Sequence, residues 1–303
     1  MRVLVAIGGN ALLKRGETLG IGNQRRNMSD AALALAAIAN EHRTILVHGN
    51  GPQVGLLALE AGAYKDAPPY PLDVLGAESQ GMIGYVIEEA LRRVMPGSEI
   101  VTLLTQTMVD PDDPAFATPS KPIGPLYDEA TAKALAAERG WSVAPDGPNG
   151  KVWRRVVASP APCAIVELET IRRLMEGGCL VVCAGGGGIP VRAGTDGAPE
   201  GVEAVIDKDL AACLLAIELG VERLLILTDV EGVYTDWGKP SQRLLKSVSA
   251  RDLDPASFAA GSMRPKIEAV RRFALETGHP AFIGRLDDAV SILAGEAGTR
   301  VSP

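Results

Sequence analysis

Three lysines lie beside structural breaks in the sequence, where their side chains could bind a phosphate group. Lys121 lies in "SKPIGP", whose prolines restrict the backbone, so we expect a shaped loop to present this lysine. Lys208 follows Asp207, the predicted N-cap of a helix, and a lysine there opposes the helix dipole and adds no stability. Asp209 is next in sequence and could hold Lys208 toward an anion at the start of the helix. Lys266, in "GSMRPKIEA", lies at a second predicted helix start, and the same argument applies to it.

Glycine-rich turns follow three predicted strands and could supply neutral donors to the same anion. They read "AIGGN", "VHGNGPQ" and "CAGGGGIP", and the first two carry Asn10 and Asn50. Ligands of a parallel sheet bind beyond the carboxyl ends of its strands, and glycine lets backbone N–H groups approach them closely. The first turn contains no lysine, so positive charge must come from elsewhere in the chain.

Nucleotide-binding fingerprints are absent, although one loop has suitable residues. The chain has no GxxxxGK[ST] motif, and "GGGGIP" does not fit a dinucleotide-binding turn. In "LILTDVEGVYTDWGKP" a strand ends at Thr228 and Asp229, and the glycine loop that follows carries Tyr234 and Trp237. This loop could wall a base or a sugar, or it could be an ordinary turn with packed aromatic side chains.

Composition narrows the possible partners. The 303 residues carry a net charge of -7, which argues against a nucleic-acid surface but leaves a small anionic substrate open. The four cysteines form no CxxC pair, and the three histidines show no metal spacing. Because no apolar run reaches the roughly 18–20 residues of a membrane span, we expect a cytoplasmic protein without a membrane partner.

Apolar strand-like runs alternate with helical patterns along most of the chain. This alternation predicts an α/β fold, a three-layer α/β/α sandwich with a mainly parallel central sheet. Predicted strands lie at 2–7, 43–48, 98–106, 179–184, 222–228 and 280–284, and a hairpin at 191–205. The proline-rich stretch from 110 to 162 breaks the rhythm and carries one helical pattern, at 128–140. It is typical of an inserted subdomain.

The motifs together resemble carbamate kinases of the amino-acid-kinase family. "GGNALL", "HGNGPQVG", "KPIGP", "VIDKD" and "GSMRPKIEA" occur in family order between residues 8 and 269. The resemblance implies two lobes: residues 1–185 for carbamate, with a protruding subdomain at about 111–161, and residues 186–303 for the nucleotide. It also implies reversible phosphoryl transfer between ATP and carbamate, Mg²⁺ carried by the nucleotide phosphates, a homodimer, and a frequent role in arginine degradation.

The resemblance also implies roles for individual residues. Sister kinases carry a lysine two residues before the first glycine pair, where this chain has Ala6. Lys121 would take over the function of that lysine. The implied catalytic residues are Lys121, Lys208 and Asp209. Carbamate or carbamoyl phosphate would meet Gly8, Gly9, Asn10, Gly49, Asn50 and Gly51. The nucleotide would meet Gly186, Gly187, Thr228, Asp229, Val230, Tyr234, Met263 and Lys266.

Two alternatives stay open at this point. One is another kinase of this fold that forms an acyl phosphate on an amino acid. The other is a non-catalytic, nucleotide-binding regulatory protein, although such a protein would be expected to have lost a catalytic lysine. Ala158 and Arg264 depart from the family pattern, and neither removes a proposed catalytic group.

Overall fold

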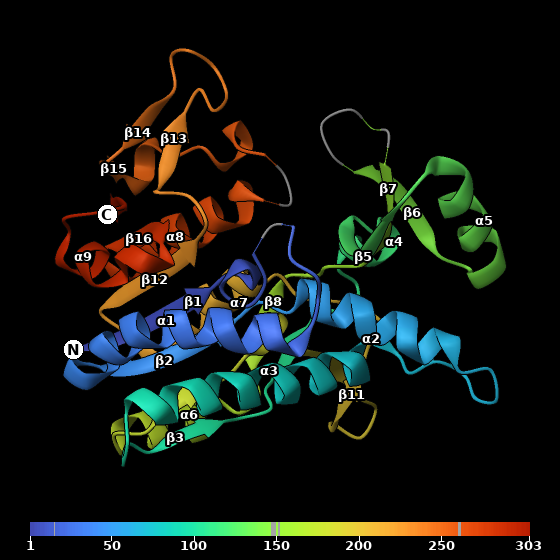
Figure 1. The fold of residues 1–303 in the computed structure, drawn as a ribbon, viewed down its shortest axis with the longest axis horizontal. Coiled ribbons are helices and arrows are strands. Elements are labelled where there is room, and N and C mark those ends of the chain that lie inside the picture. The colour runs from blue at the N-terminus through green and yellow to red at the C-terminus, as the bar shows by residue number, and fades with distance from the viewer. Residues whose placement is uncertain (15, 147–149, 151, 260–261) are drawn as a thin grey trace.

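A central sheet runs through the molecule in the order β15-β17-β16-β12-β1-β2-β9-β3. The structure, a computed structural model, describes residues 1–14, 16–146, 150, 152–259 and 262–303 (Figure 1). Neighbouring strands run parallel except β16 and β17, which are antiparallel. The strands are β1 (Arg2–Ile7), β2 (Arg43–His48), β3 (Ile100–Thr102), β9 (Leu180–Val182), β12 (Arg223–Thr228), β15 (Ser247–Ser249), β16 (Ala281–Arg285) and β17 (Thr299–Ser302).

Helices cover both faces of this sheet, because its strands are apolar on both sides. Val3, Val5 and Ile7 of β1 pack in one core, while Leu4 and Ala6 pack in the other. The first core includes residues of α1 (Ile21–Glu41), α3 (Leu72–Val94) and α9 (Ala289–Ala294). The second includes residues of α6 (Leu168–Glu176), α7 (Lys208–Leu219) and α8 (Met263–Thr277). The three-layer prediction with a mainly parallel sheet is confirmed.

A second sheet has four strands, in the order β11-β10-β4-β8. Its strands are β4 (Gln106–Val109), β8 (Pro162–Ile165), β10 (Ile189–Ala193) and β11 (Pro199–Gly201). Strands β10 and β11 form the predicted hairpin. The prediction of one strand over 98–106 is wrong, because the chain leaves the central sheet after Thr102 and enters the second sheet at Gln106. Between them, Thr105 exchanges two hydrogen bonds with the buried Gln80 side chain, at 3.1 and 2.9 Å.

The proline-rich insert folds around a sheet of its own, in the order β5-β7-β6. Figure 1 shows it projecting away from the central sheet. Of its elements only the helix, at 128–140, was predicted, because β5 carries two prolines and shifts register between Ile123 and Tyr127. The elements are α4 (Pro114–Ala117), β5 (Lys121–Tyr127), α5 (Glu129–Arg139), β6 (Ser142–Asp146) and β7 (Val152–Val157).

Two further elements border the site. Helix α2 (Gly51–Ala63) follows the second glycine turn and packs against β5. The hairpin of β13 (Val233–Thr235) and β14 (Arg243–Leu245) forms from the segment that was expected to be a glycine loop. The division into two lobes between residues 185 and 186 stays a prediction. Strands from both sides of that boundary belong to the central sheet. Among the described residues, no helix is long and apolar enough to cross a membrane.

Candidate active site

The glycine turns after β1, β2 and β9 lie at neighbouring strand ends of the central sheet. The Gly8 amide donates to Leu227 O at 3.0 Å, and the Gly49 amide donates to Ile7 O at 3.0 Å, so both turns continue the sheet pairing. A Cβ on Gly49 would lie 3.1 Å from the Gly9 nitrogen. Glycine therefore lets the first two turns pack backbone to backbone.

The third turn packs against the second at Gly186. This residue has φ +65°, and a Cβ there would lie 2.1 Å from Asn50 Nδ2. Ala184, just before the turn, also has a positive φ of 48° and is held by its amide, which donates to Thr105 Oγ1 at 2.9 Å. Asn50 itself donates from Nδ2 to Ser79 Oγ at 2.8 Å. Close packing around the Asn50 amide thus explains why the third turn has glycine at this position. The side chain of Asn10, in the first turn, lies outside the described part of the chain.

The N-terminus of α7 carries a cluster of charged side chains. Asp207 is the predicted N-cap, and its Oδ1 accepts from the amides of Asp209 and Leu210 at 2.9 and 3.4 Å. Lys208 Nζ lies 2.6 Å from Asp209 Oδ1, and Lys266 Nζ, from the first turn of α8, lies 2.7 Å from Asp209 Oδ2. One buried carboxylate therefore orients two ammonium groups.

The electrostatic balance in this cluster keeps Asp209 ionised. Burial acts to raise the pKa of Asp209, but the neighbouring charges of Lys208 and Lys266 outweigh it and hold that pKa well below its usual range. Burial lowers the pKa of Lys208, and the Asp209 carboxylate offsets this only in part. Burial also acts against a charged Lys266, yet Asp209 raises its pKa. The buried Asp209 carboxylate thus stays charged, and its charge favours the protonated forms of both lysines.

Lys121 reaches the same place from the protruding subdomain. Its Nζ lies 2.6 Å from Asp207 Oδ2, and its side chain is 27% exposed. A cavity of about 230 Å³ opens here, and all three lysines line it. It is also lined by Gly9, Gly49, Asn50, Gly51, Gly186, Asp207, Asp209 and Ser262. The structure therefore brings together most of the predicted catalytic and substrate residues.

A larger cavity of about 570 Å³ lies next to it, over β12 and the hairpin β13–β14. The Tyr234 and Trp237 rings meet edge to face, with centroids 5.2 Å apart. Six of the predicted nucleotide residues line it: Thr228, Asp229, Val230, Tyr234, Met263 and Lys266. Lys266 and Ser262 line both cavities, so the two spaces meet at the start of α8.

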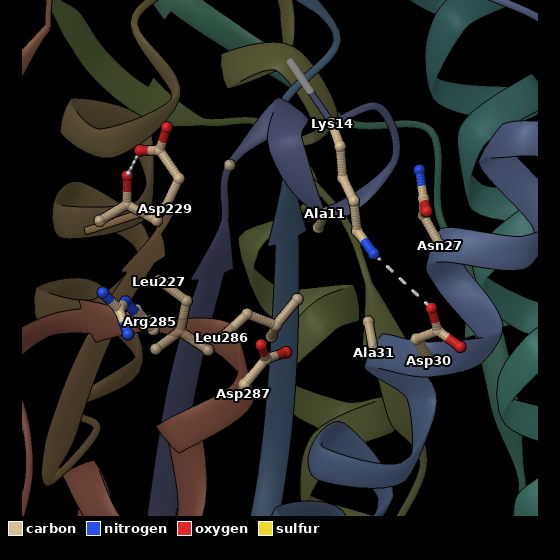
Figure 2. Close-up of a pocket in the computed structure, with 12 residues that line it drawn as sticks. Ala11, Lys14, Asn27, Asp30, Ala31, Leu227, Asp229, Arg285, Leu286 and Asp287 are labelled. Atoms are coloured by element: carbon tan, nitrogen blue, oxygen red, sulfur yellow. Dashed lines mark hydrogen bonds and ion pairs between the residues drawn. The ribbon is translucent and has the colours of Figure 1, made fainter. Parts of the chain in front are cut away.

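Of the predicted residues whose side chains the structure describes, two lie outside these two cavities. Gly187 is buried, and a Cβ there would lie 2.5 Å from Ile206 O, so it serves the packing of the turn. Gly8 lines a third cavity, of about 460 Å³, on the α1 side of the sheet (Figure 2). Lys14 points across that cavity to Asp30, with Nζ 3.8 Å from Oδ2. Its side chain is 61% exposed, so Lys14 is a surface residue.

Sequence reasoning missed two residues of the site. Asp207 was recognised only as a helix cap, although its second oxygen binds Lys121. Ser79 supports Asn50 and donates to Gly76 O at 2.7 Å, from the middle of α3. The signal for Asp207 was its place beside Lys208 in "VIDKD", whereas a serine within a helix gives none.

Known proteins are similar to this chain over nearly its whole length. The model of the amino acid kinase family matches residues 1–285. Carbamate kinase of Haemophilus influenzae is 49% identical over 303 residues, which cover 100% of this chain and 97% of that protein. The structure of carbamate kinase from Giardia lamblia bound to citric acid has a TM-score of 0.92 and 40% identity, covering 99% of this chain and 98% of that one. The same Giardia enzyme bound to AMP-PNP has a TM-score of 0.89, with 40% identity and the same coverage.

These matches cover both the sequence and the fold of the chain. The chain belongs to the amino acid kinase family and, within it, to the carbamate kinases.

Proposed function

We propose that this chain transfers a phosphoryl group reversibly between ATP and carbamate, giving ADP and carbamoyl phosphate. The observation that carries the proposal is the meeting of two cavities at Lys266, one small and cationic and the other larger and partly aromatic. A compact anion suits the first and a nucleoside suits the second. The phosphoryl group would then pass between them, beside the three lysines.

The residues present suit a reaction that needs positioning and charge more than covalent help. Carbamate already carries a nucleophilic oxygen anion, so the transfer requires no general base. Lys121 and Lys208 would contact the moving phosphoryl group from opposite elements, β5 and α7, and offset its charge. Lys266 would bind the nucleotide phosphates, and Asp209 would hold Lys208 and Lys266 in place.

Mg²⁺ would enter with the nucleotide. The two carboxylates nearest the site, Asp207 and Asp209, already bind lysine ammonium groups. In the described ranges no three His, Cys, Asp or Glu side chains gather into a metal-binding cluster. These residues therefore fit an ion held mainly by phosphate oxygens and water, whose chemistry is to neutralise charge on the transferred group.

The ion pairs around the small cavity also bear on the two alternatives. An amino-acid substrate needs a group for its α-amino group, whereas both aspartates that line the small cavity already pair with lysines. A regulatory protein would not need three lysines held by buried or half-buried ion pairs. The homodimer, the cytoplasmic location and a role in arginine degradation stay predictions.

A phosphoryl-donor panel tests the proposal. Purified protein with Mg²⁺ and ADP is mixed with carbamoyl phosphate or acetyl phosphate, and ATP is measured. The reverse reaction compares carbamate with glutamate and acetylglutamate as acceptors. We expect carbamoyl phosphate and carbamate to be the preferred substrates. Faster phosphorylation of either amino acid would overturn the assignment.

A further inference from the structure

The contact between Lys121 and Asp207 joins two parts of the molecule that are far apart in sequence. Lys121 Nζ donates to Asp207 Oδ2 at 2.6 Å. The other carboxylate oxygen is bound by two backbone amides of α7, so the first turn of that helix fixes its direction. The Asp207 side chain is 11% exposed, and solvent therefore screens the pair weakly. Asp207 thus offers a rigid, charged anchor at the edge of the cavity.

Other contacts also hold the subdomain to the body of the molecule. The Val205 amide donates to Ala158 O at 3.0 Å, and Arg155 Nη2 lies 3.2 Å from Glu203 Oε1. Gly124 packs against Gly55, where a Cβ would lie 2.6 Å from the Gly124 Cα. These contacts place the subdomain over α2, but they do not fix the end of a long lysine side chain.

Repulsion between like charges makes such an anchor necessary. Lys121, Lys208 and Lys266 converge on one cavity of about 230 Å³. Asp209 is already shared by two of these lysines, at 2.6 and 2.7 Å. Without a further carboxylate, Lys121 would meet a cationic site, and its flexible side chain would turn toward solvent.

We propose that Asp207 is a positioning residue that holds the Lys121 ammonium at the α7 N-terminus, so that docking of the subdomain and assembly of the catalytic charge are one event. The inference rests on the proposed function. Before the substrate binds, the carboxylate balances the third ammonium group. When a phosphoryl group arrives, its oxygens take over this charge, and Lys121 is already beside them. Asp207 acts through Lys121 and does not contact the reacting atoms.

The variant Asp207→Asn isolates this role, because asparagine caps a helix about as well as aspartate. We expect the melting temperature to stay close to that of the wild type. In the ATP-forming assay, kcat/KM for carbamoyl phosphate should fall about 10-fold or more, the scale of a lost charge-assisted hydrogen bond. The matched control is Asp128→Asn, which makes the same change at the exposed N-cap of α5 and should leave the kinetics unchanged.

A double-mutant cycle separates positioning from a general effect on α7. In a Lys121→Ala background, Asp207→Asn should change kcat/KM by less than about 2-fold, because there is no ammonium group left to hold. An equal loss with and without Lys121 would overturn the proposal. So would a gain in kcat/KM in the single variant, which would mean that Asp207 restrains Lys121 instead of delivering it.

Hydrogen exchange of the substrate-free protein gives a readout that does not depend on activity. The Val205 amide, which bonds to Ala158 across the junction, should exchange about 10-fold faster in Asp207→Asn. If the wild type lacks carbamate kinase activity but this change occurs, the proposed function fails and the docking role stands. If the wild type is active and the variant matches it in exchange and kinetics, the positioning role fails.

Discussion

Replacing Lys208 by methionine should slow catalysis strongly while preserving the fold. The Lys208 side chain is 12% exposed, so water cannot substitute for the missing ammonium group. Loss of one preorganised donor to a transition state costs about 3–4 kcal/mol, which corresponds to a decrease in kcat of about 10²–10³. Because the group is buried and points into the small cavity, we expect the larger of these values.

The same variant should change stability only a little, because two opposing effects act on it. Burial lowers the pKa of Lys208, so the folded protein binds this proton less tightly than the unfolded chain does. Methionine fills the same space and removes this cost, but it also removes one of the two positive charges that keep the buried Asp209 ionised. Asp209 keeps Lys266 at 2.7 Å as its partner. The two effects oppose each other, so the melting temperature of Lys208→Met is expected to stay close to that of the wild type.

Steady-state kinetics with carbamoyl phosphate and ADP, together with a thermal melt, measure both effects. Lys14→Ala is the matched control, since this lysine also pairs with an aspartate but is 61% exposed and faces the third cavity. It should leave kcat and the melting temperature unchanged. A Lys208→Met enzyme with near-normal kcat would refute the catalytic assignment, and a large fall in melting temperature would refute the argument on stability.

Three further predictions concern Gly186, His48 and Trp237. Gly186→Ala should lower both stability and activity, because the residue has φ +65° and the new Cβ would meet the Asn50 amide; a variant with wild-type melting temperature and kcat would contradict this. Burial lowers the pKa of His48 to about 4, so stability should fall by about 3 kcal/mol as pH drops from about 6.5 to about 4. Urea unfolding across that range should show this loss in the wild type and not in His48→Gln. Trp237→Ala should raise KM for ADP several-fold with little change in kcat, and an unchanged KM would place the base elsewhere.

Periodicity and turn residues predicted the central architecture well, because each buried strand is a short apolar run and each helix has an apolar face. The strand 2–7 and the helix start at Lys208 match the structure at these positions. The subdomain sheet was missed, because β5 contains Pro122 and Pro125 and its pairing with β7 is irregular. Local patterns carry little information on strands that pair through bulges.

The site was predictable where one residue has an unfavourable local position, and less so where its role depends on a distant partner. Lys208 opposes the helix dipole, which is visible in sequence, and it does pair with Asp209 as expected. The partner of Lys121 is 86 positions away in sequence, so only the tertiary fold could identify Asp207. The roles of Gly186 and Gly187 also differ in a way that spacing cannot show, since one lines the cavity and the other packs beneath it.

The central claim is that Lys121, from the protruding subdomain, supplies positive charge to the phosphoryl group. The first strand of the central sheet cannot do so, because it has Ala6 where sister kinases have a lysine. Rapid-quench single-turnover kinetics of carbamoyl phosphate and ADP test it most directly, with wild type and Lys121→Ala at saturating substrate. The chemical step should be slower in the variant by about 10²–10³. A variant that binds substrate more weakly but transfers the phosphoryl group at the wild-type rate would contradict the account.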